Sequence, residues 1–195
     1  VANETWNEKN ARFGWVDFVD DKEVSQALFA TAENWARSKG MTAVHGPLGF
    51  TDFDHEGVLV EGYDRPGTLA TIYNYPYYVD HIESLGYVKD ADWKEYLITI
   101  PEVFPEKYFR IAEIVKQKYK LQSLRFKSRK EVVDRYAQKI FDLLNLCYKD
   151  LYGFTKLNDD QIKFYIKLYF SFFRLDTISV VVDEKDDVVA LGIAM

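Results

Sequence analysis

The spacing of apolar residues predicts a strand, a helix and a second strand near the start of the chain. Between residues 21 and 39 apolar side chains recur every three or four positions, which predicts an amphipathic helix. Asp20 and Glu23 stand three residues apart, as in a helix-capping pair. Residues 13–19 are aromatic or β-branched and residues 42–45 follow the helix, so both segments are predicted to be strands. The apolar face of the helix is predicted to hold Val24, Ala27, Leu28, Ala32, Trp35 and Ala36.

The rest of the chain is also predicted to contain both helices and strands. Residues 46–66 are too rich in Gly, Pro and Asp for a long helix and predict a structured loop. Helices are predicted at 73–86 and 101–120, after Ser128 and after Asn158. Strands are predicted at 58–60, 93–100, 121–126, 178–182 and 188–193, the last two as a hairpin. This mixture predicts an α+β protein.

Composition and charge narrow the classes of function. With 48% hydrophobic and 29% charged residues, the chain is predicted to fold around a sizeable core. A net charge of −6 opposes binding to nucleic acid or to an anionic membrane, so we expect neither partner. A basic run within residues 116–130 is interpreted as a solvated face, with a phosphate site as the alternative. Cys147 is the only cysteine, and its leucine neighbours predict a core position. The lack of a signal segment or long apolar span predicts a cytoplasmic protein.

One short motif carries a resemblance to a known family. Leu85, Gly86 and Tyr87 end a predicted helix and precede a predicted strand. Residues 15–100 thereby resemble the C-terminal half of the GNAT fold of the acyl-CoA N-acyltransferase superfamily, in which a similar Leu-Gly-Phe ends the helix after the splayed strand. Residues 121–195 resemble the N-terminal half of that fold. The stretches GPLGFTDFDHEGVLVEGYD and YNYPYYVDHIESLGY are similar to a bacterial tandem GNAT-like family.

The resemblance implies an α+β fold with a GNAT-like mixed, mostly antiparallel sheet flanked by helices, its halves in permuted order. Residues 1–100 would form the C-terminal half of one domain, residues 101–120 a bridging helix, and residues 121–195 the N-terminal half of a second domain. The portions could instead form one composite domain with a single sheet, or two chains could complement each other as a homodimer. Because the chain begins at Val1 and ends at Met195 within a predicted strand, we expect a piece of a longer protein.

The resemblance also implies a reaction. This is acyl transfer from acetyl-CoA or another acyl-CoA to the amine of a small molecule or a peptide, in which a base removes the ammonium proton. A second interpretation is a non-catalytic GNAT-like module that binds a partner or supports a catalytic domain. A Fem-type aminoacyl transferase is a third, which the acidic balance disfavours.

The start of the helix at 21–39 is where the resemblance implies a cofactor site. A GNAT holds the CoA pyrophosphate there on backbone N–H groups, through a loop that contains glycine. The candidate cofactor contacts are Lys22, Val24, Ser25 and Asn74. The segment has no glycine, and it carries three carboxylates that repel a phosphate, those of Asp20, Asp21 and Glu23. We therefore interpret it as a degenerate CoA loop, with an ordinary capped helix as the favoured structural reading.

His45 and Tyr78 are the candidate catalytic residues. His45 ends a predicted strand before Gly46 and Pro47, where the resemblance implies that substrate passes, although a satisfied structural histidine is the alternative. Many GNATs place a tyrosine general acid at the position held here by Ile82, and Tyr78 substitutes for it only if the helix register differs.

Two further groups of polar residues are weaker candidates. Residues 52–56 (DFDHE) combine three carboxylates with an imidazole, which could supply a general base or ligate a metal. Their spacing is not diagnostic, and no metal site is predicted. His81 lies beside Asp80 and close to Glu83, so it is predicted to lie on the surface.

Overall fold

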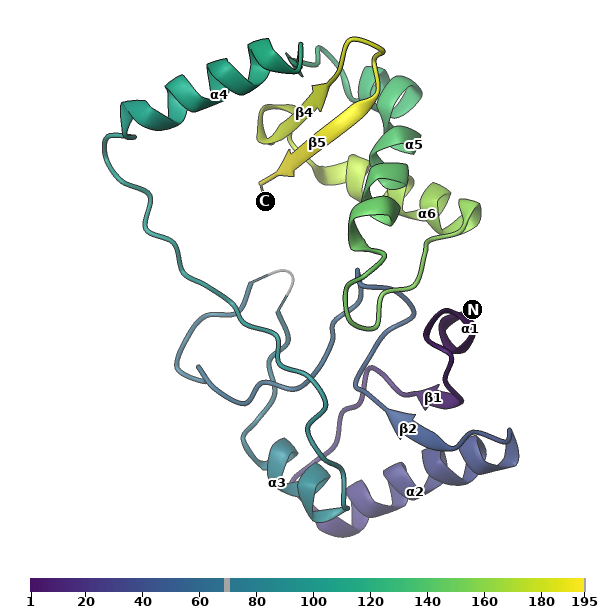
Figure 1. The fold of residues 1–195 in the computed structure, drawn as a ribbon. Coiled ribbons are helices and arrows are strands. Elements are labelled where there is room, and N and C mark those ends of the chain that lie inside the picture. The colour runs from purple at the N-terminus through teal and green to yellow at the C-terminus, as the bar shows by residue number, and fades with distance from the viewer. Residues whose placement is uncertain (69–70, 195) are drawn as a thin grey trace. The chain divides into compact units, whose positions relative to one another are not determined.

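The computed structural model of this chain describes residues 1–68 and 71–194, which form two compact units (Figure 1). The first unit comprises Val1–Glu95 with Leu151–Thr155, and the second comprises Tyr96–Asp150 with Lys156–Met195. Both units combine helices and strands, which confirms the predicted mixed α+β class. The assignment of these units to halves of a GNAT-like fold stays a prediction.

The first unit carries a short parallel sheet. Its elements are α1 (Ala2–Trp6), β1 (Asn10–Arg12), α2 (Lys22–Ser38), β2 (Ala43–His45) and α3 (Tyr77–Ser84). β1 and β2 pair in parallel, with Asn10 opposite Ala43 and Arg12 opposite His45. α2 is the crossover between the two strands, and it contacts both β2 and α3. The predicted order of strand, helix and strand is therefore confirmed, although the first strand lies at 10–12 instead of 13–19.

Residues at the two ends of α2 determine where this helix begins and ends. Asp21 is its N-cap, and the carboxylate of Asp21 accepts a hydrogen bond from the backbone N–H of Glu23 at 2.8 Å. The capping residue is thus Asp21 and not Asp20. Gly40, at φ 72°, follows the helix in the left-handed conformation that glycine tolerates best. The buried positions are Ser25, Phe29 and Ala36. Ala36 was predicted, whereas Ser25 and Phe29 each lie one residue beyond a predicted apolar position.

An aromatic cluster forms the core beneath α2. Phe18, Phe29 and Tyr78 are its buried members, and each is at most 6% exposed. The Phe18 and Tyr78 rings stack with centroids 4.3 Å apart, and Phe13 meets Phe29 edge-on at 5.2 Å. Burial of one such side chain contributes about 2–3 kcal/mol relative to its exposure. The aromatic run at 13–19 therefore packs as irregular chain in this core and does not form the predicted strand.

The second unit is built on an antiparallel sheet. Its elements are α4 (Glu106–Lys118), β3 (Gln122–Leu124), α5 (Arg129–Tyr148), α6 (Asp159–Phe172), a 3₁₀ turn (Leu175–Thr177), β4 (Ile178–Val182) and β5 (Val188–Ile193). The strands pair in the order β3-β4-β5, and the predicted hairpin of β4 and β5 is confirmed. Ser128 caps α5 and Asn158 caps α6, both as predicted.

The core of the second unit lies where α5 meets α6 and β5. It is made by apolar side chains that are almost fully buried, among them Val132, Tyr136, Ile140, Ile162, Val180 and Val182. Asn145 is a buried polar residue of α5. Its side-chain amide donates to the carbonyl of Leu157 at 3.2 Å and accepts from the N–H of Leu157 at 2.8 Å, so the turn before α6 is held to α5.

Several expectations are wrong. Residues 58–60 and 93–100 form no strand, because an alternating pattern makes a strand only when a neighbouring strand accepts its hydrogen bonds. The described strands form two separate sheets and not one composite sheet. Cys147 is exposed, since α5 turns its buried face elsewhere. Within residues 1–68 and 71–194, no helix has both the length and the apolarity that a membrane crossing requires.

Candidate active site

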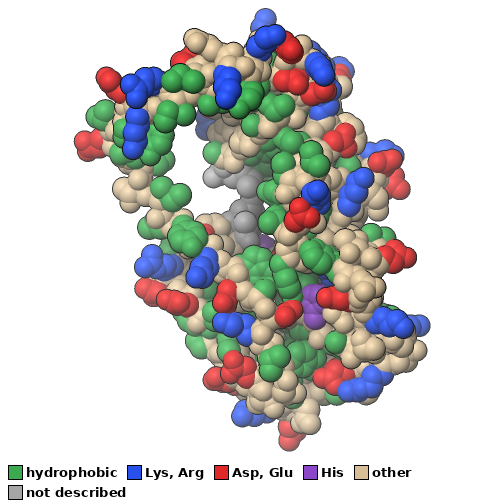
Figure 2. Space-filling view, in the orientation of Figure 1, with side chains coloured by type: hydrophobic (Ala, Val, Ile, Leu, Met, Phe, Trp, Pro, Cys, Tyr) green, Lys and Arg blue, Asp and Glu red, His purple; other side chains and the backbone are tan. Residues whose placement is uncertain are grey.

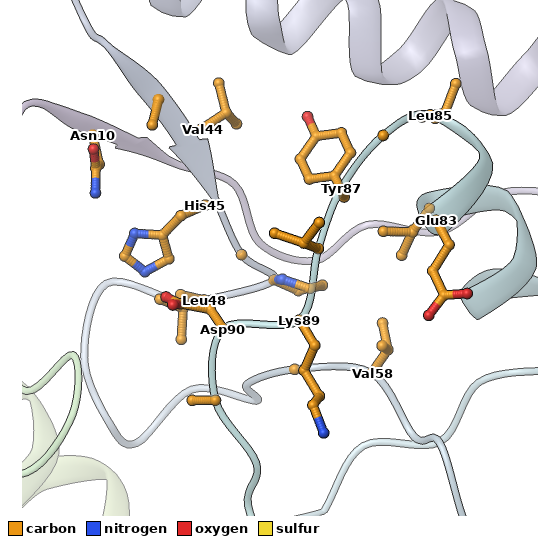
Figure 3. Close-up of a pocket in the computed structure, with 18 of the residues that line it drawn as sticks. Asn10, Val44, His45, Leu48, Val58, Glu83, Leu85, Tyr87, Lys89 and Asp90 are labelled. Carbon is orange, nitrogen blue, oxygen red and sulfur yellow. The ribbon is translucent and has the colours of Figure 1, made fainter.

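The first unit contains a cavity of about 600 Å³ beside the end of β2 (Figure 3). This volume is within the range of small-molecule sites, which is about 300–1,000 Å³. Its walls come from β2 and the following turn, the C-terminal half of α2, α3, and residues 85–93. The apolar lining includes Ala36, Val44, Pro47, Leu48, Val58, Val60, Val79, Ile82, Leu85 and Val88.

The backbone at the end of β2 fixes the position of His45. The N–H of Phe13 donates to the carbonyl of His45 at 3.1 Å, and the N–H of Leu48 donates to the carbonyl of Phe13 at 2.7 Å. A Cβ atom at Gly46 would lie 2.2 Å from the carbonyl oxygen of Phe13, and Gly46 has a φ of 154°. Glycine is therefore required where the two chain segments cross.

His45 lines the cavity and carries a buried ring nitrogen. Its side chain is half-buried and lines the cavity, as Figure 3 shows. The buried Nε2 atom has no hydrogen-bond partner among the described residues. Burial, and then the nearby Arg12 guanidinium, lower the pKa of His45 below its usual 6.5, while Glu8 and Asp90 act in the opposite direction. The ring is therefore neutral at pH 7, and it can accept a proton.

Residues from a distant part of the chain complete the cavity. Arg12 Nη2 donates to the carbonyl of Gly153 at 2.7 Å, and Trp6 Nε1 donates to the carbonyl of Phe154 at 2.9 Å. These contacts bring Tyr152 to the cavity, where its ring centroid is 6.3 Å from that of His45. The Tyr152 hydroxyl donates to the carboxylate of Asp90, and burial together with this bond raises the pKa of Tyr152 to about 12.

The sequence predicted neither Tyr152 nor its anchors, Arg12 and Asp90. No spacing rule links residue 152 with residues 12 and 90. The one local sign is Gly153, which has a φ of 72° and so marks a special turn immediately after Tyr152.

The residues of the DFDHE segment differ in their surroundings and in their roles. Asp54 is structural, because its Oδ2 atom accepts from the N–H groups of Phe50 and Thr51 at 2.8 and 3.1 Å. Burial raises the pKa of Asp52, and burial together with the Asp52 charge raises the pKa of Glu56 to about 7. Among residues 1–68 and 71–194, no three His, Cys, Asp or Glu side chains form a group that could hold a metal ion. His55 is exposed.

Tyr78 does not line the cavity. It lies in the aromatic core, where its hydroxyl donates to the carboxylate of Asp17 and accepts from the N–H of Phe18 at 3.2 Å. Burial and the bond to Asp17 raise the pKa of Tyr78 to about 12. The structure therefore brings His45 to the cavity and keeps Tyr78, the other candidate catalytic residue, in a packing role.

The candidate cofactor contacts do not fit a diphosphate. The side chains of Lys22 and Val24 are exposed at the start of α2, where the Asp21 carboxylate already takes a backbone N–H group. The hydroxyl of Ser25 is buried and donates to the carbonyl of Lys22 at 3.1 Å. A pyrophosphate at this helix start would displace the cap and meet the carboxylates of Asp21 and Glu23.

His81 occupies this region instead, and the prediction that it lies on the surface is wrong. It is 2% exposed. Its Nδ1 atom lies 2.9 Å from the hydroxyl of Ser25, and its Nε2 atom lies 3.0 Å from the carboxylate of Asp20. α3 turns His81 inward because Tyr78, three residues earlier on the same face, is anchored in the core.

Asn74 does not line the cavity, and it clamps a segment of chain that does. Its Oδ1 atom accepts from the N–H of Leu59 at 2.6 Å, and its Nδ2 atom donates to the carbonyls of Leu59 and Tyr75 at 3.2 and 3.0 Å. Both ends of its amide are occupied. The clamp fixes the chain between Val58 and Val60, two residues that line the cavity.

Charges at the cavity favour a cation. Its acidic residues are Glu33, Glu83, Asp90 and Asp92, and its basic residues are Arg37 and Lys89. Arg37 is paired with Glu33 at 2.7 Å, and Lys89 is paired with Asp92 at 3.0 Å. The carboxylates of Glu83 and Asp90 therefore remain uncompensated by these cations, and they attract a positively charged ligand.

Two known proteins are similar to parts of this chain. Protein YghO of Escherichia coli (strain K12) is 36% identical to this chain over 92 residues, which are 47% of this chain and 24% of YghO. The bacterial ceramide synthase of Caulobacter vibrioides (strain NA1000 / CB15N) is 27% identical over 158 residues, which are 79% of this chain and 39% of the synthase. The chain thus spans less than two fifths of the length of either relative. No protein-family model and no solved structure matches it.

Proposed function

We propose that this chain is part of an N-acyltransferase, which moves an acyl group from a thioester to an amine, and that His45 is its general base. The observation that carries the proposal is the free Nε2 atom of His45 beside an apolar cavity. A buried ring nitrogen without a partner is costly, so its presence at a cavity is typical of a site that a ligand completes.

The reaction requires a base. An amine attacks the thioester carbonyl only through its lone pair, so the ammonium proton must leave. A bond then forms between the amine nitrogen and the acyl carbon, the carbon–sulfur bond breaks, and a thiolate departs. Because burial keeps His45 neutral at pH 7, its ring nitrogen can accept the amine proton. The proposal assigns no carrier to the thioester, since the start of α2 does not fit a diphosphate.

The cavity suits an amine that carries a hydrocarbon chain. The carboxylates of Glu83 and Asp90 would attract the ammonium group, and the apolar walls would contact the hydrocarbon. A ceramide is an amide formed on a long-chain amine, so the name of the Caulobacter relative supports this pair of features. We therefore propose a long-chain amine as the acceptor and a fatty acyl thioester as the donor.

One observation favours the second candidate, a non-catalytic GNAT-like module. At the start of α2 the Asp21 carboxylate holds the N–H group that a phosphate would need. A module that only supports another domain would keep the fold without an acyl donor. The two proposals differ in what they expect of His45, because only the acyltransferase needs its ring nitrogen.

The test is amide formation by the 195-residue chain. A fatty acyl thioester and a long-chain primary amine are mixed with the chain, and the amide is measured by mass spectrometry. We expect His45→Gln to lower the rate at least about 100-fold, which is the usual contribution of a general base. His55→Gln is the matched control, because His55 is exposed and does not line the cavity.

Two results would count against the acyltransferase. Equal rates for the wild type and His45→Gln would remove His45 from the mechanism. A chain that neither forms the amide nor binds the amine or the thioester would favour the non-catalytic module.

A further inference from the structure

Two aromatic rings meet in the wall of the cavity. Trp93 and Tyr152 both line it, and their rings stand at 75° to one another with centroids 5.6 Å apart. This edge-to-face contact leaves an angle between the two rings, which we call the aromatic corner. Trp93 is 52% exposed and Tyr152 is 41% exposed, so a large part of each ring is accessible to a ligand.

Local contacts hold both rings of the aromatic corner in place. The Trp93 ring lies against the backbone at Gly57, where an added Cβ atom would be 3.6 Å from the nearest ring atom. The hydroxyl of Tyr152 donates to the carboxylate of Asp90. The segment that carries Tyr152 is held in turn by Arg12, which donates to the next carbonyl along the chain at 2.7 Å. The corner therefore exists before a ligand binds.

Negative charge lies beside the aromatic corner. The Asp90 carboxylate lines the cavity and is bonded to one of the two rings. Burial and this bond raise the pKa of Tyr152, the charges of Asp90 and Glu8 raise it further, and the Arg12 charge lowers it by less than either. Negative charge thus outweighs positive charge at the Tyr152 hydroxyl. Figure 2 shows acidic side chains next to hydrophobic ones over the first unit.

Ring faces together with a carboxylate select one class of ligand. The face of an aromatic ring is the negative part of its quadrupole, so it attracts a cation. An anion would be repelled both by the ring faces and by Asp90, and a neutral alkyl group would gain nothing from the carboxylate. An organic ammonium combines positive charge with apolar surface, and so it uses both kinds of contact.

We propose that the aromatic corner binds the ammonium group of an organic amine, and that it accepts N-methylated ammonium groups as well as primary ones. Ring faces attract the charge without accepting directed hydrogen bonds, so they need no N–H group. The ring centroids of Tyr152 and His45 are 6.3 Å apart, so an ammonium in the corner lies next to the proposed base. Its role in the reaction rests on the proposed function, whereas its binding does not.

The aromatic corner also distinguishes the two uncompensated carboxylates of the cavity. Asp90 is bonded to Tyr152, a ring of the corner. Glu83 belongs to α3, and Figure 3 shows it away from His45 and Asp90. We therefore expect Asp90 to contribute more than Glu83 to the binding of an ammonium group.

The experiment compares three ligands by isothermal titration calorimetry with the 195-residue chain. Hexyltrimethylammonium, hexylamine and hexanol share one hydrocarbon and differ in charge and in N–H groups. We expect hexyltrimethylammonium to bind at least as tightly as hexylamine, and hexanol to bind most weakly. Trp93→Leu should lower the affinity for hexyltrimethylammonium about 5–30-fold, because it removes one ring face, and should change that for hexanol less than about twofold.

Matched variants separate the aromatic corner from other parts of the first unit. Trp35→Leu is the control for Trp93→Leu, because Trp35 is also exposed but does not line the cavity. Asp90→Asn should weaken the binding of hexyltrimethylammonium roughly fivefold or more, while the new amide oxygen can still accept from Tyr152. Glu83→Gln removes a charge of the same kind from the cavity and should have a smaller effect. Urea midpoints check that each variant is folded.

Three results would overturn the proposal. Hexyltrimethylammonium could bind much more weakly than hexylamine, hexanol could bind as tightly as both, or Trp93→Leu could bind like Trp35→Leu. Failure of the proposed function looks different. A chain that binds hexyltrimethylammonium through Trp93 but forms no amide keeps the ammonium site and loses the acyltransferase. A chain that forms the amide without binding hexyltrimethylammonium shows the reverse.

Discussion

Replacement of Asn74 by alanine tests whether this residue is a structural clamp or a ligand contact. The alanine variant loses both hydrogen bonds to Leu59 and the one to Tyr75. Each bond contributes about 0.5–1.5 kcal/mol net, and unpaired buried groups cost more. Since the Leu59 backbone is only half-buried, water can satisfy part of the loss. We expect the free energy of unfolding of the first unit to fall by about 2–3 kcal/mol.

Tryptophan fluorescence during urea unfolding is the appropriate assay. The four tryptophans, Trp6, Trp15, Trp35 and Trp93, all lie in the first unit, so their emission reports that unit alone. With a denaturant slope of about 2 kcal/mol per M, the expected loss shifts the urea midpoint by roughly 1 M. Asn34→Ala is the control, because Asn34 is exposed on α2 and its change should shift the midpoint by less than about 0.3 M.

One outcome would show that Asn74 contacts a ligand. If Asn74→Ala kept the urea midpoint of the wild type but bound a fatty acyl thioester more weakly, Asn74 would be a ligand contact and not a clamp. If both quantities changed, titration of the thioester at a urea-free, fully folded condition would separate them. Affinity that is unchanged in the folded protein supports the clamp.

Three further predictions follow from single residues. Gly49→Ala should destabilise the first unit by about 1–3 kcal/mol in the same assay, because the new Cβ would lie 2.0 Å from Cβ of Asp54, whereas Gly67→Ala in the same unit, with its nearest neighbour 3.5 Å away, should be tolerated. Burial raises the pKa of Glu56 from its ordinary 4.5 to about 7 in the folded state, so the unfolded state ionises first. Stability should therefore fall as pH rises from about 4.5 to 7 and then level off, and Glu56→Gln should reduce this slope in urea midpoints. Cys147 is exposed, so Ellman's reagent should modify one thiol per folded chain without denaturant, and a thiol that reacts only in urea would contradict the structure.

Local signals in the sequence predicted the helices well. Ser128 and Asn158 were identified as helix caps because a cap needs only its own side chain and the next three residues. The hairpin of β4 and β5 was predicted for a similar reason, since its turn lies between two adjacent β-branched runs. In α2 the error was one position, because Asp20 and Asp21 offer the same carboxylate and only the backbone geometry selects Asp21.

Features that depend on distant partners were not predictable. The periodicity of α2 fitted a face with Leu28, but the structure buries Phe29, whose ring meets Phe13 and Tyr87. A rotation by one residue changes the buried face without changing the helical pattern. Similarly, His45 was selected from its place at a strand end, whereas its neighbour Tyr152 was not, because no local rule relates the two.

The attachment of Leu151–Thr155 to the first unit has a consequence for how the protein is synthesised. A ribosome completes residues 1–95 well before it adds this segment, so the nascent first unit waits for about 55 residues until the strip that anchors on Trp6 and Arg12 emerges. Until then Arg12 has no carbonyl of Gly153 to bind, and the wall beside His45 is unfinished. A gene fragment meant to express the histidine cavity intact must therefore extend to residue 155, and one that ends at 95 would yield an open, unanchored precursor.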